Sequence, residues 1–94
     1  MPTFMIVRDI PGASAMTEEQ ASQTVAMSEG TLTAMRGEGK DIAQERSFVV
    51  GDNIFCVYNA SSAELIHEHS KRTGIPLTSV REVAGEIQHD TSGY

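Results

Sequence analysis

Two strand-like runs separated by a two-residue turn occupy the middle of the chain and restrict its possible folds. Residues 41–50 and 53–59 carry many β-branched and aromatic side chains, and Gly51-Asp52 stands between them. A short turn of this kind joins two antiparallel strands in a hairpin. The second run is apolar at every position from 54 to 58, so both of its faces carry hydrophobic side chains. The fold therefore has to account for hydrophobic side chains on both faces of this hairpin.

The residues before the hairpin predict one strand and one helix. The side chains of residues 3–10 alternate between the two faces of a predicted strand, and Pro11-Gly12 ends this strand. The segment Thr17-Glu18-Glu19-Gln20 is a capping box, which predicts a helix over 17–36. The helix side expected to be buried is formed by Ala21, Val25, Ser28, Leu32 and Met35, which recur at spacings of three and four.

The residues after the hairpin predict a second helix and a last strand. Ser61-Ser62-Ala63-Glu64 is another capping box, so we expect this helix to begin at Ser61 or Ser62. Gly74 is placed for a left-handed C-cap, and Pro76 prevents the helix from continuing. A final strand is predicted over 79–87.

The predicted order of strand, helix, strand, strand, helix, strand is that of the ferredoxin-like α+β fold, βαββαβ. Right-handed crossovers place both helices on one face of a four-stranded antiparallel sheet. We expect one domain over residues 1–87, followed by a polar tail over 88–94. Because two helices cover only one face, the hydrophobic open face is predicted to meet a second copy of the chain and form a homodimer. The alternative is that the C-terminal tail folds over this face.

Composition excludes several classes of protein. The net charge of −6, from 13 acidic and 7 basic residues, argues against nucleic-acid binding. The single cysteine, Cys56, cannot form an intrachain disulfide. The N-terminus lacks the pattern of a signal peptide and no apolar run is long enough to span a membrane, so we expect a cytoplasmic protein without membrane association. No glycine-rich phosphate loop or serine-centred catalytic motif occurs, so no organic cofactor and no catalytic residue is predicted.

His67 and His69 are the candidate metal ligands. Imidazole suits nickel, zinc and copper. Residues two positions apart on a helix point about 200° from each other, so at most one of these histidines joins a given site. The alternative is that both are surface or partly buried histidines without a ligand.

The residues Cys56, Ser47, Glu45 and Asp9 are candidates to line a pocket. Cys56 is either a small core residue or a group facing a polar pocket near His69, since the second helix must cross the sheet that contains it. Glu45 and Ser47 are predicted to share a strand face; the alternative for Glu45 is an exposed or interface charge pair with Arg46. Asp9 and Arg8 are charges in a central strand, which is costly unless they are paired, so they indicate a pocket or a dimer contact.

Short motifs from Ser47 onward occur together in one protein family. They are Ser47-Phe48-Val49, Phe55-Cys56-Val57-Tyr58-Asn59-Ala60, Ile66-His67-Glu68-His69, Gly74-Ile75-Pro76 and Val80-Arg81-Glu82-Val83. In this pattern the chain resembles the small bacterial nickel-binding proteins of ferredoxin-like fold. The resemblance implies binding of nickel or another divalent transition metal, with His69 at the position of the family's histidine. The chain departs from the family at Asn59, a further candidate pocket residue where a glutamate is common, and at Arg8 in a strand where many relatives carry a histidine.

Three functional hypotheses remain open. In the first, the chain is a small metal-binding protein of the nickel type without enzymatic activity, and His69 is assisted by carboxylate or thiolate groups. In the second, it is a dimeric α+β barrel enzyme, of the cofactor-free monooxygenase or isomerase type. A small apolar organic substrate would then lie between the helices and the sheet, in contact with His69, Cys56 or Ser47. In the third, it is a regulatory or interaction module.

Overall fold

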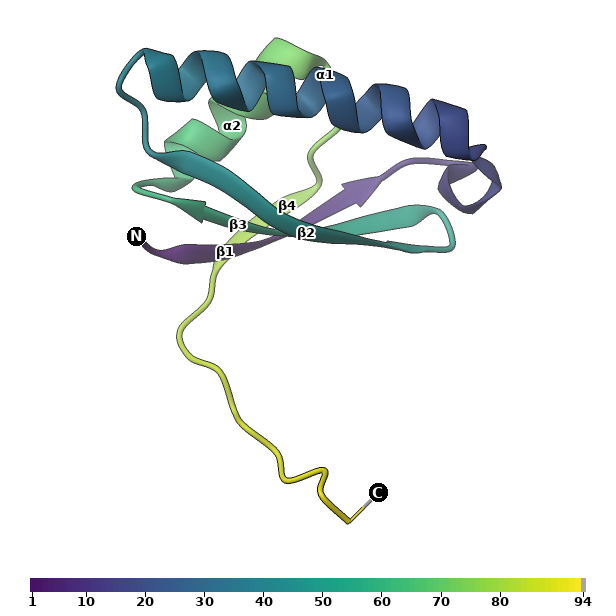
Figure 1. The fold of residues 1–94 in the computed structure, drawn as a ribbon, viewed down its shortest axis with the longest axis vertical. Coiled ribbons are helices and arrows are strands. Elements are labelled where there is room, and N and C mark those ends of the chain that lie inside the picture. Colours follow the sequence, from purple (N-terminus) through teal and green to yellow (C-terminus); the bar gives the residue numbers. More distant parts are fainter. Residues whose placement is uncertain (94) are drawn as a thin grey trace.

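The computed structural model describes residues 1–93 and has the element order predicted from the sequence (Figure 1). The elements are β1 (Thr3–Asp9), a short 3-10 helix η1 (Ala13–Ala15), α1 (Glu18–Gly37), β2 (Ile42–Val50), β3 (Asn53–Ala60), α2 (Ala63–Thr73) and β4 (Ser79–Glu82). The strands form one antiparallel sheet in the order β2-β3-β1-β4, and both helices lie on the same side of it (Figure 1). This arrangement is the predicted ferredoxin-like α+β fold.

The two helices begin differently. At α1 the predicted capping box forms, since the Thr17 hydroxyl accepts the Gln20 N–H at 3.1 Å and the Gln20 side chain accepts the Thr17 N–H at 3.0 Å. At α2 the N-cap is Ser62, whose side chain makes no capping hydrogen bond, so the second predicted capping box is wrong. Gly74 ends α2 as expected, with a φ of 76° that glycine adopts without a steric penalty.

Strand β4 is shorter than predicted and ends at Glu82. Its partner is β1, and the pairing finishes where Phe4 lies opposite Glu82 and the Val83 N–H donates to the Thr3 carbonyl at 2.8 Å. Because β1 begins at Thr3, the following residues find no strand beside them. Residues 84–93 leave the sheet and extend away from it (Figure 1).

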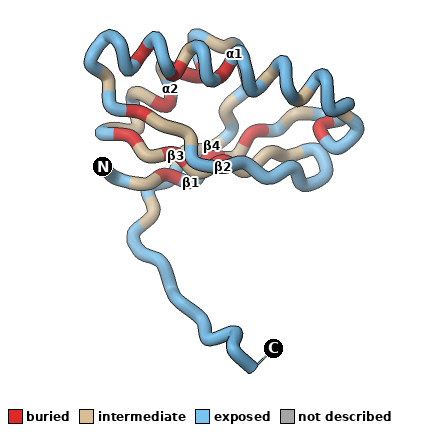
Figure 2. Tube along the Cα trace, viewed as in Figure 1, coloured by how far each residue is buried: buried red, intermediate tan, exposed pale blue. Residues whose placement is uncertain are grey.

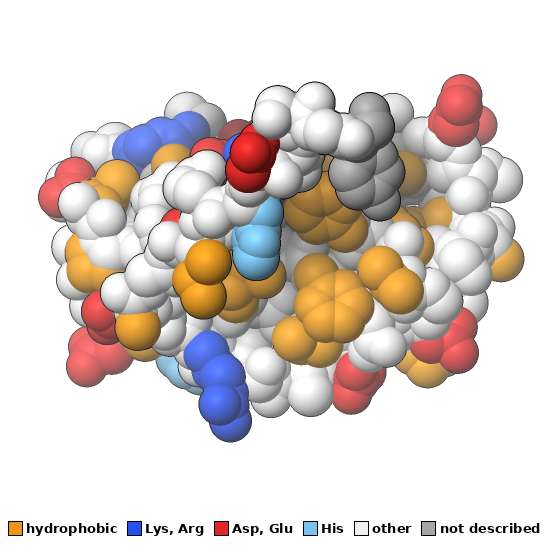
Figure 3. Space-filling model, turned by 90° about the horizontal axis from the view of Figure 1, so that it is seen from below, with side chains coloured by type: hydrophobic (Ala, Val, Ile, Leu, Met, Phe, Trp, Pro, Cys, Tyr) orange, Lys and Arg blue, Asp and Glu red, His pale blue; other side chains and the backbone are white. Residues whose placement is uncertain are grey.

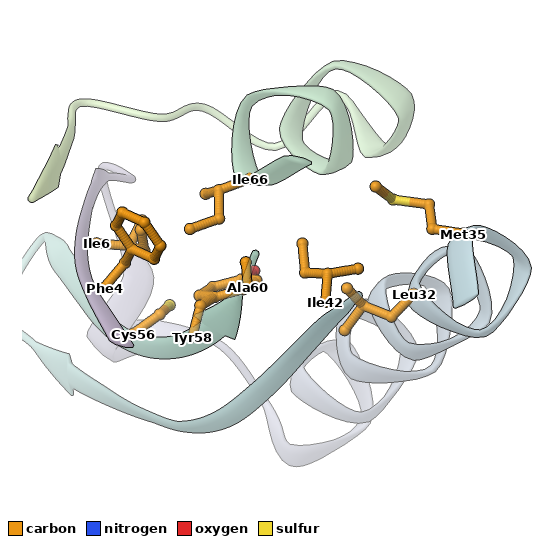
Figure 4. Packing of buried hydrophobic residues seen from close by; sticks show 9 residues of the cluster. All are labelled: Phe4, Ile6, Leu32, Met35, Ile42, Cys56, Tyr58, Ala60 and Ile66. Atoms are coloured by element: carbon orange, nitrogen blue, oxygen red, sulfur yellow. The ribbon is translucent and has the colours of Figure 1, made fainter. Parts of the chain in front are cut away.

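The core lies between the sheet and the two helices (Figures 2 and 4). Its buried hydrophobic members are Phe4, Ile6, Leu32, Met35, Ile42, Cys56, Tyr58, Ala60 and Ile66. Val25, which was expected to be buried with Leu32 and Met35, is instead 59% exposed. The reason is that the N-terminal half of α1 covers an open pocket rather than packed side chains. Within the described part of the chain, no helix is long and apolar enough to cross a membrane.

A β-bulge in β2 decides which of its side chains face the helices. Gln44 lies opposite Tyr58 and Arg46 lies opposite Val57, so Glu45 is an extra residue without a partner in β3. After the bulge, Ser47 lies opposite Cys56. Gln44 and Ser47 therefore share the helix-facing side of the sheet, although strict alternation would place residues three positions apart on opposite sides.

Candidate functional site

An open pocket lies between the N-terminal half of α1 and the part of the sheet formed by β2 and β3. Its volume is about 350 Å³, which is at the lower end of the range for small-molecule sites. Apolar side chains form most of its wall, and they include Ile10, Met16, Ala21, Val25, Val49, Ile54 and Ile75. Polar side chains also line it, including Arg8, Ser28, Gln44, Ser47, Cys56 and Tyr58.

Arg8 points from β1 to the helix-facing side of the sheet, where it is only 3% exposed. Its Nη1 donates to the Ser70 hydroxyl and to the Pro76 carbonyl, both at 2.9 Å. Its Nη2 donates to the Tyr58 hydroxyl at 3.0 Å. All of these acceptors are uncharged, and no carboxylate of residues 1–93 forms an ion pair with Arg8. The guanidinium is thus held in the interior by neutral groups alone.

His69 lies on the buried side of α2 and has hydrogen-bond partners at both ring nitrogens. Nδ1 is 3.2 Å from the Tyr58 hydroxyl, and Nε2 is 3.3 Å from the Ser28 carbonyl oxygen and 3.2 Å from the Ser28 hydroxyl. A carbonyl oxygen only accepts, so we assign the proton to Nε2, and Nδ1 accepts from Tyr58.

The surroundings of His69 favour its neutral form. Burial lowers the pKa of the His69 imidazole below its ordinary value of 6.5; the hydrogen bond to the Ser28 carbonyl opposes this effect, and the nearby Arg8 charge adds to it. Burial also raises the pKa of the Tyr58 hydroxyl, despite the opposing charge of Arg8. Both groups therefore stay neutral near pH 7, which keeps Tyr58 as the donor to His69.

The hydrogen bonds continue from His69 to Cys56. The Ser28 hydroxyl donates to Gln44 Oε1 at 3.3 Å, Gln44 Nε2 donates to the Ser47 hydroxyl, and that hydroxyl donates to Cys56 Sγ at 3.2 Å. The resulting polar chain consists, in order, of Arg8, Tyr58, His69, Ser28, Gln44, Ser47 and Cys56. Each member donates to the next, so the hydrogen bonds of the polar chain all run in one direction, from the Arg8 guanidinium to the Cys56 thiol. A buried network of this kind fixes the orientation of every member.

The polar chain unites four residues that the sequence singled out, namely Arg8, His69, Ser47 and Cys56. His69 and Cys56 are linked only through Ser28, Gln44 and Ser47 and share no direct hydrogen bond. Sequence reasoning missed the roles of Tyr58, Gln44 and Ser28. Ser28 did carry a signal, because it was predicted on the buried side of α1, where a hydroxyl needs a partner.

The other candidate residues lie at the rim of the pocket or away from it. Glu45 is an exposed rim residue whose carboxylate is 3.4 Å from the Arg46 guanidinium. Asn59 accepts a hydrogen bond from the Thr3 hydroxyl at 2.8 Å, and Asp9 accepts one from the Asn53 amide. His67 is exposed on α2. Neither Asn59, Asp9 nor His67 lines the pocket.

Comparison with known proteins provides a family for the chain. The family model described as nickel responsive protein SCO4226-like matches residues 4–83. The chain belongs to this family. The motif-based resemblance is thereby confirmed at the level of the family. A search of curated proteins gave no match.

A solved structure supports the same fold. The chain is similar to SCO4226 from Streptomyces coelicolor A3(2), whose crystal structure superimposes with a TM-score of 0.71 and 20% sequence identity. The match covers 90% of this chain and 99% of SCO4226. At this level of identity, the similarity shows a common fold.

The description of the SCO4226-like family names a response to nickel, but the surroundings of His69 do not fit a bound nickel ion. Both ring nitrogens of His69 are already in hydrogen bonds, and their partners Tyr58 and Ser28 are neutral oxygen groups. Over residues 1–93, no group of three or more histidine, cysteine, aspartate or glutamate side chains lies close enough together to hold a metal. A nickel site at His69 would therefore require the polar chain to open.

Proposed function

We propose that this SCO4226-like protein is a small, non-enzymatic binding protein whose pocket beneath α1 holds a small organic molecule. The observation that carries the proposal is an open, mostly apolar pocket of about 350 Å³ with a few polar groups held in fixed positions. Sites for small organic molecules commonly have this form. The hydrogen bonds of Gln44 and Ser47 orient these side chains before a ligand arrives, which lowers the entropic cost of binding.

The arrangement of Cys56 and His69 favours binding over catalysis. Nucleophilic catalysis needs a base within hydrogen-bond reach of the nucleophile. Here Ser47, Gln44 and Ser28 lie between the thiol and the imidazole. The protonated Nε2 of His69 also faces the Ser28 oxygens rather than a substrate.

Blocking the pocket tests this proposal. Val25 lines it from α1 and is 59% exposed, so in Val25→Trp the indole can occupy the entrance. We expect this change to weaken binding of two six-carbon probes, hexanoate and hexanamide, by roughly tenfold or more, measured by calorimetry and NMR shift changes. Ala26→Trp is the matched control, because Ala26 is an exposed neighbour on α1 that does not line the pocket. Equal effects of the two substitutions, or no binding of either probe to the wild type, would contradict the proposal.

Nickel binding is a second candidate function, and family membership favours it. His67 is the more available imidazole, because it is exposed on α2 while both nitrogens of His69 are engaged. In calorimetric titrations of the untagged protein with nickel chloride, we expect His67→Ala to weaken binding about tenfold or more. His89→Ala, in the exposed C-terminal tail, is the control and should leave the affinity unchanged. Binding that depends on His89 alone would make the metal site an adventitious one on the tail.

We further propose that the protein works as a homodimer through the open face of the sheet. Val7, Phe55 and Phe48 lie side by side across β1, β3 and β2 on the side opposite the helices. Figure 3 shows hydrophobic side chains gathered on this face. Phe48 is 53% exposed, and a contiguous apolar patch of this kind usually marks an interface. The exposed course of residues 84–93 away from the sheet disfavours the alternative that the tail covers the patch.

A further inference from the structure

The pocket contains a positive charge without a counter-ion. Arg8 is 3% exposed, and its hydrogen-bond acceptors are the neutral oxygens of Ser70, Tyr58, Ile75 and Pro76. Moving a guanidinium out of water is costly unless an anion lies beside it. Proteins normally provide that anion from an aspartate or a glutamate, but none of residues 1–93 does so for Arg8.

Part of the Arg8 guanidinium remains available to a ligand. Its hydrogen bonds start from Nη1 and Nη2, and Nε donates to no group of the described chain. In that part of the chain, no fully buried side-chain nitrogen or oxygen lacks a partner, so Nε is not sealed inside the protein. Arg8 belongs to the wall of the pocket, and we take the pocket as the route by which a ligand reaches Nε.

The other charges of the pocket lie at its rim and do not neutralise Arg8. Glu45 and Arg46 pair with each other at 3.4 Å, and both are exposed. Glu29 is an exposed residue of α1 whose charge acts on the pKa of Tyr58 and of His69, but within the described residues it forms no ion pair with Arg8, and water and salt weaken its effect there. The inner part of the pocket therefore favours one negative charge.

We propose that the ligand of this pocket is a small organic carboxylate, with the carboxylate against Arg8 and the apolar part along Ile10, Val25 and Ile54. The inference rests on the proposed function, because it names the ligand class of the same pocket. A carboxylate matches the planar guanidinium and brings one negative charge, whereas a phosphate monoester brings almost two. At about 30 Å³ for each water-sized group, the pocket of about 350 Å³ holds roughly a dozen such groups, which suits a small acid.

A pair of ligands that differ in charge but not in shape tests this inference. We expect calorimetry to show that the wild type binds hexanoate roughly 10 to 100 times more tightly than hexanamide, since charge-assisted hydrogen bonds are the stronger kind. In Arg8→Met, which removes the charge but keeps an unbranched side chain, the two affinities should become equal within about threefold. Arg8→Lys keeps the charge and should retain a preference for hexanoate.

The outcomes separate this inference from the proposed function. Equal affinities of the wild type for hexanoate and hexanamide, both reduced by Val25→Trp, would overturn the carboxylate and leave the pocket as a binding site. An unchanged preference in Arg8→Met would also overturn it, because the charge would then be recognised elsewhere. If Arg8→Met does not fold, the wild-type comparison and Arg8→Lys still decide the matter. If the wild type binds neither probe, both the carboxylate ligand and the proposed function of the pocket are contradicted.

Discussion

His69→Ala is expected to lower the free energy of unfolding by about 4 kcal/mol, whereas His67→Ala should change it by less than about 0.5 kcal/mol. Truncation of His69 removes the acceptor of the Tyr58 hydroxyl proton and one partner of Ser28, and it leaves a cavity in a fully buried position. His67 is exposed on the same helix and its imidazole forms no hydrogen bond in the described part of the chain, so it is a matched control. Urea unfolding followed by circular dichroism at pH 7.5 measures both values.

The pH dependence of the same variants provides an independent readout. Burial holds the pKa of His69 in the folded state below 6.5, so the unfolded chain takes up this proton more readily. The contribution of neutral His69 to stability is therefore complete above about pH 6.5 and declines as the pH falls through the unfolded value toward the lowered folded one. Between pH 7.5 and pH 5, His67→Ala should lose more stability than His69→Ala. Equal losses in the two variants would mean that His69 is not the buried neutral group described above.

The fold was predictable from the sequence because its signals are local. The alternation around Phe4 and Ile6, the capping residues Thr17 and Gln20, and Gly74 each act on a few neighbouring residues, and the structure confirms all of them. The end of β4 was not predictable in the same way. It depends on where β1 begins, which is more than seventy residues earlier in the chain.

The site was predictable only in part, because its geometry depends on several elements at once. Ser47, Cys56 and His69 were candidates from their chemistry, but the order in which they connect depends on the bulge at Glu45, for which the sequence provides no clear signal. Without the bulge, with Glu45 paired regularly in the ladder, Gln44 and Ser47 would face opposite sides, and the link between His69 and Cys56 would be lost. The one-residue bulge at Glu45 thus decides whether these separate polar side chains form a continuous hydrogen-bonded chain.

Arg8 shows what the sequence of a strand can predict about a charged residue and what it cannot. The sequence identified it as a charge in a central strand that needs a partner, and the structure buries it on the helix-facing side of β1, which it shares with Phe4 and Ile6. The sequence left open whether this charge belongs to a pocket or to a dimer contact. The structure places it in the wall of the pocket, away from the open face. The two sides of the sheet therefore have separate roles in our proposals, with ligand recognition on one side and association on the other.

This separation allows the proposed dimer contact to be changed at Phe48 while the pocket stays intact, and a control substitution can be placed at Val49 in the pocket wall. Phe48→Glu is expected to weaken dimerisation by about 100-fold, because it places a carboxylate within a proposed apolar interface beside Phe55 and Val7. Sedimentation equilibrium at micromolar concentrations measures the change. The wild type should have about twice the 10.2 kDa mass of the chain, and Phe48→Glu should approach the mass of a single chain.

Val49→Glu is the matched control for this experiment. Val49 is the next residue of β2 and is similarly exposed, at 49% against 53% for Phe48, but it lies opposite Ile54 on the helix-facing side. The added charge is the same in both variants, so a general effect of net charge would act on them equally. If the open face is the interface, Val49→Glu stays dimeric while Phe48→Glu dissociates. A wild type that sediments as a single chain would remove the homodimer, and equal dissociation of both variants would place the contact on another surface.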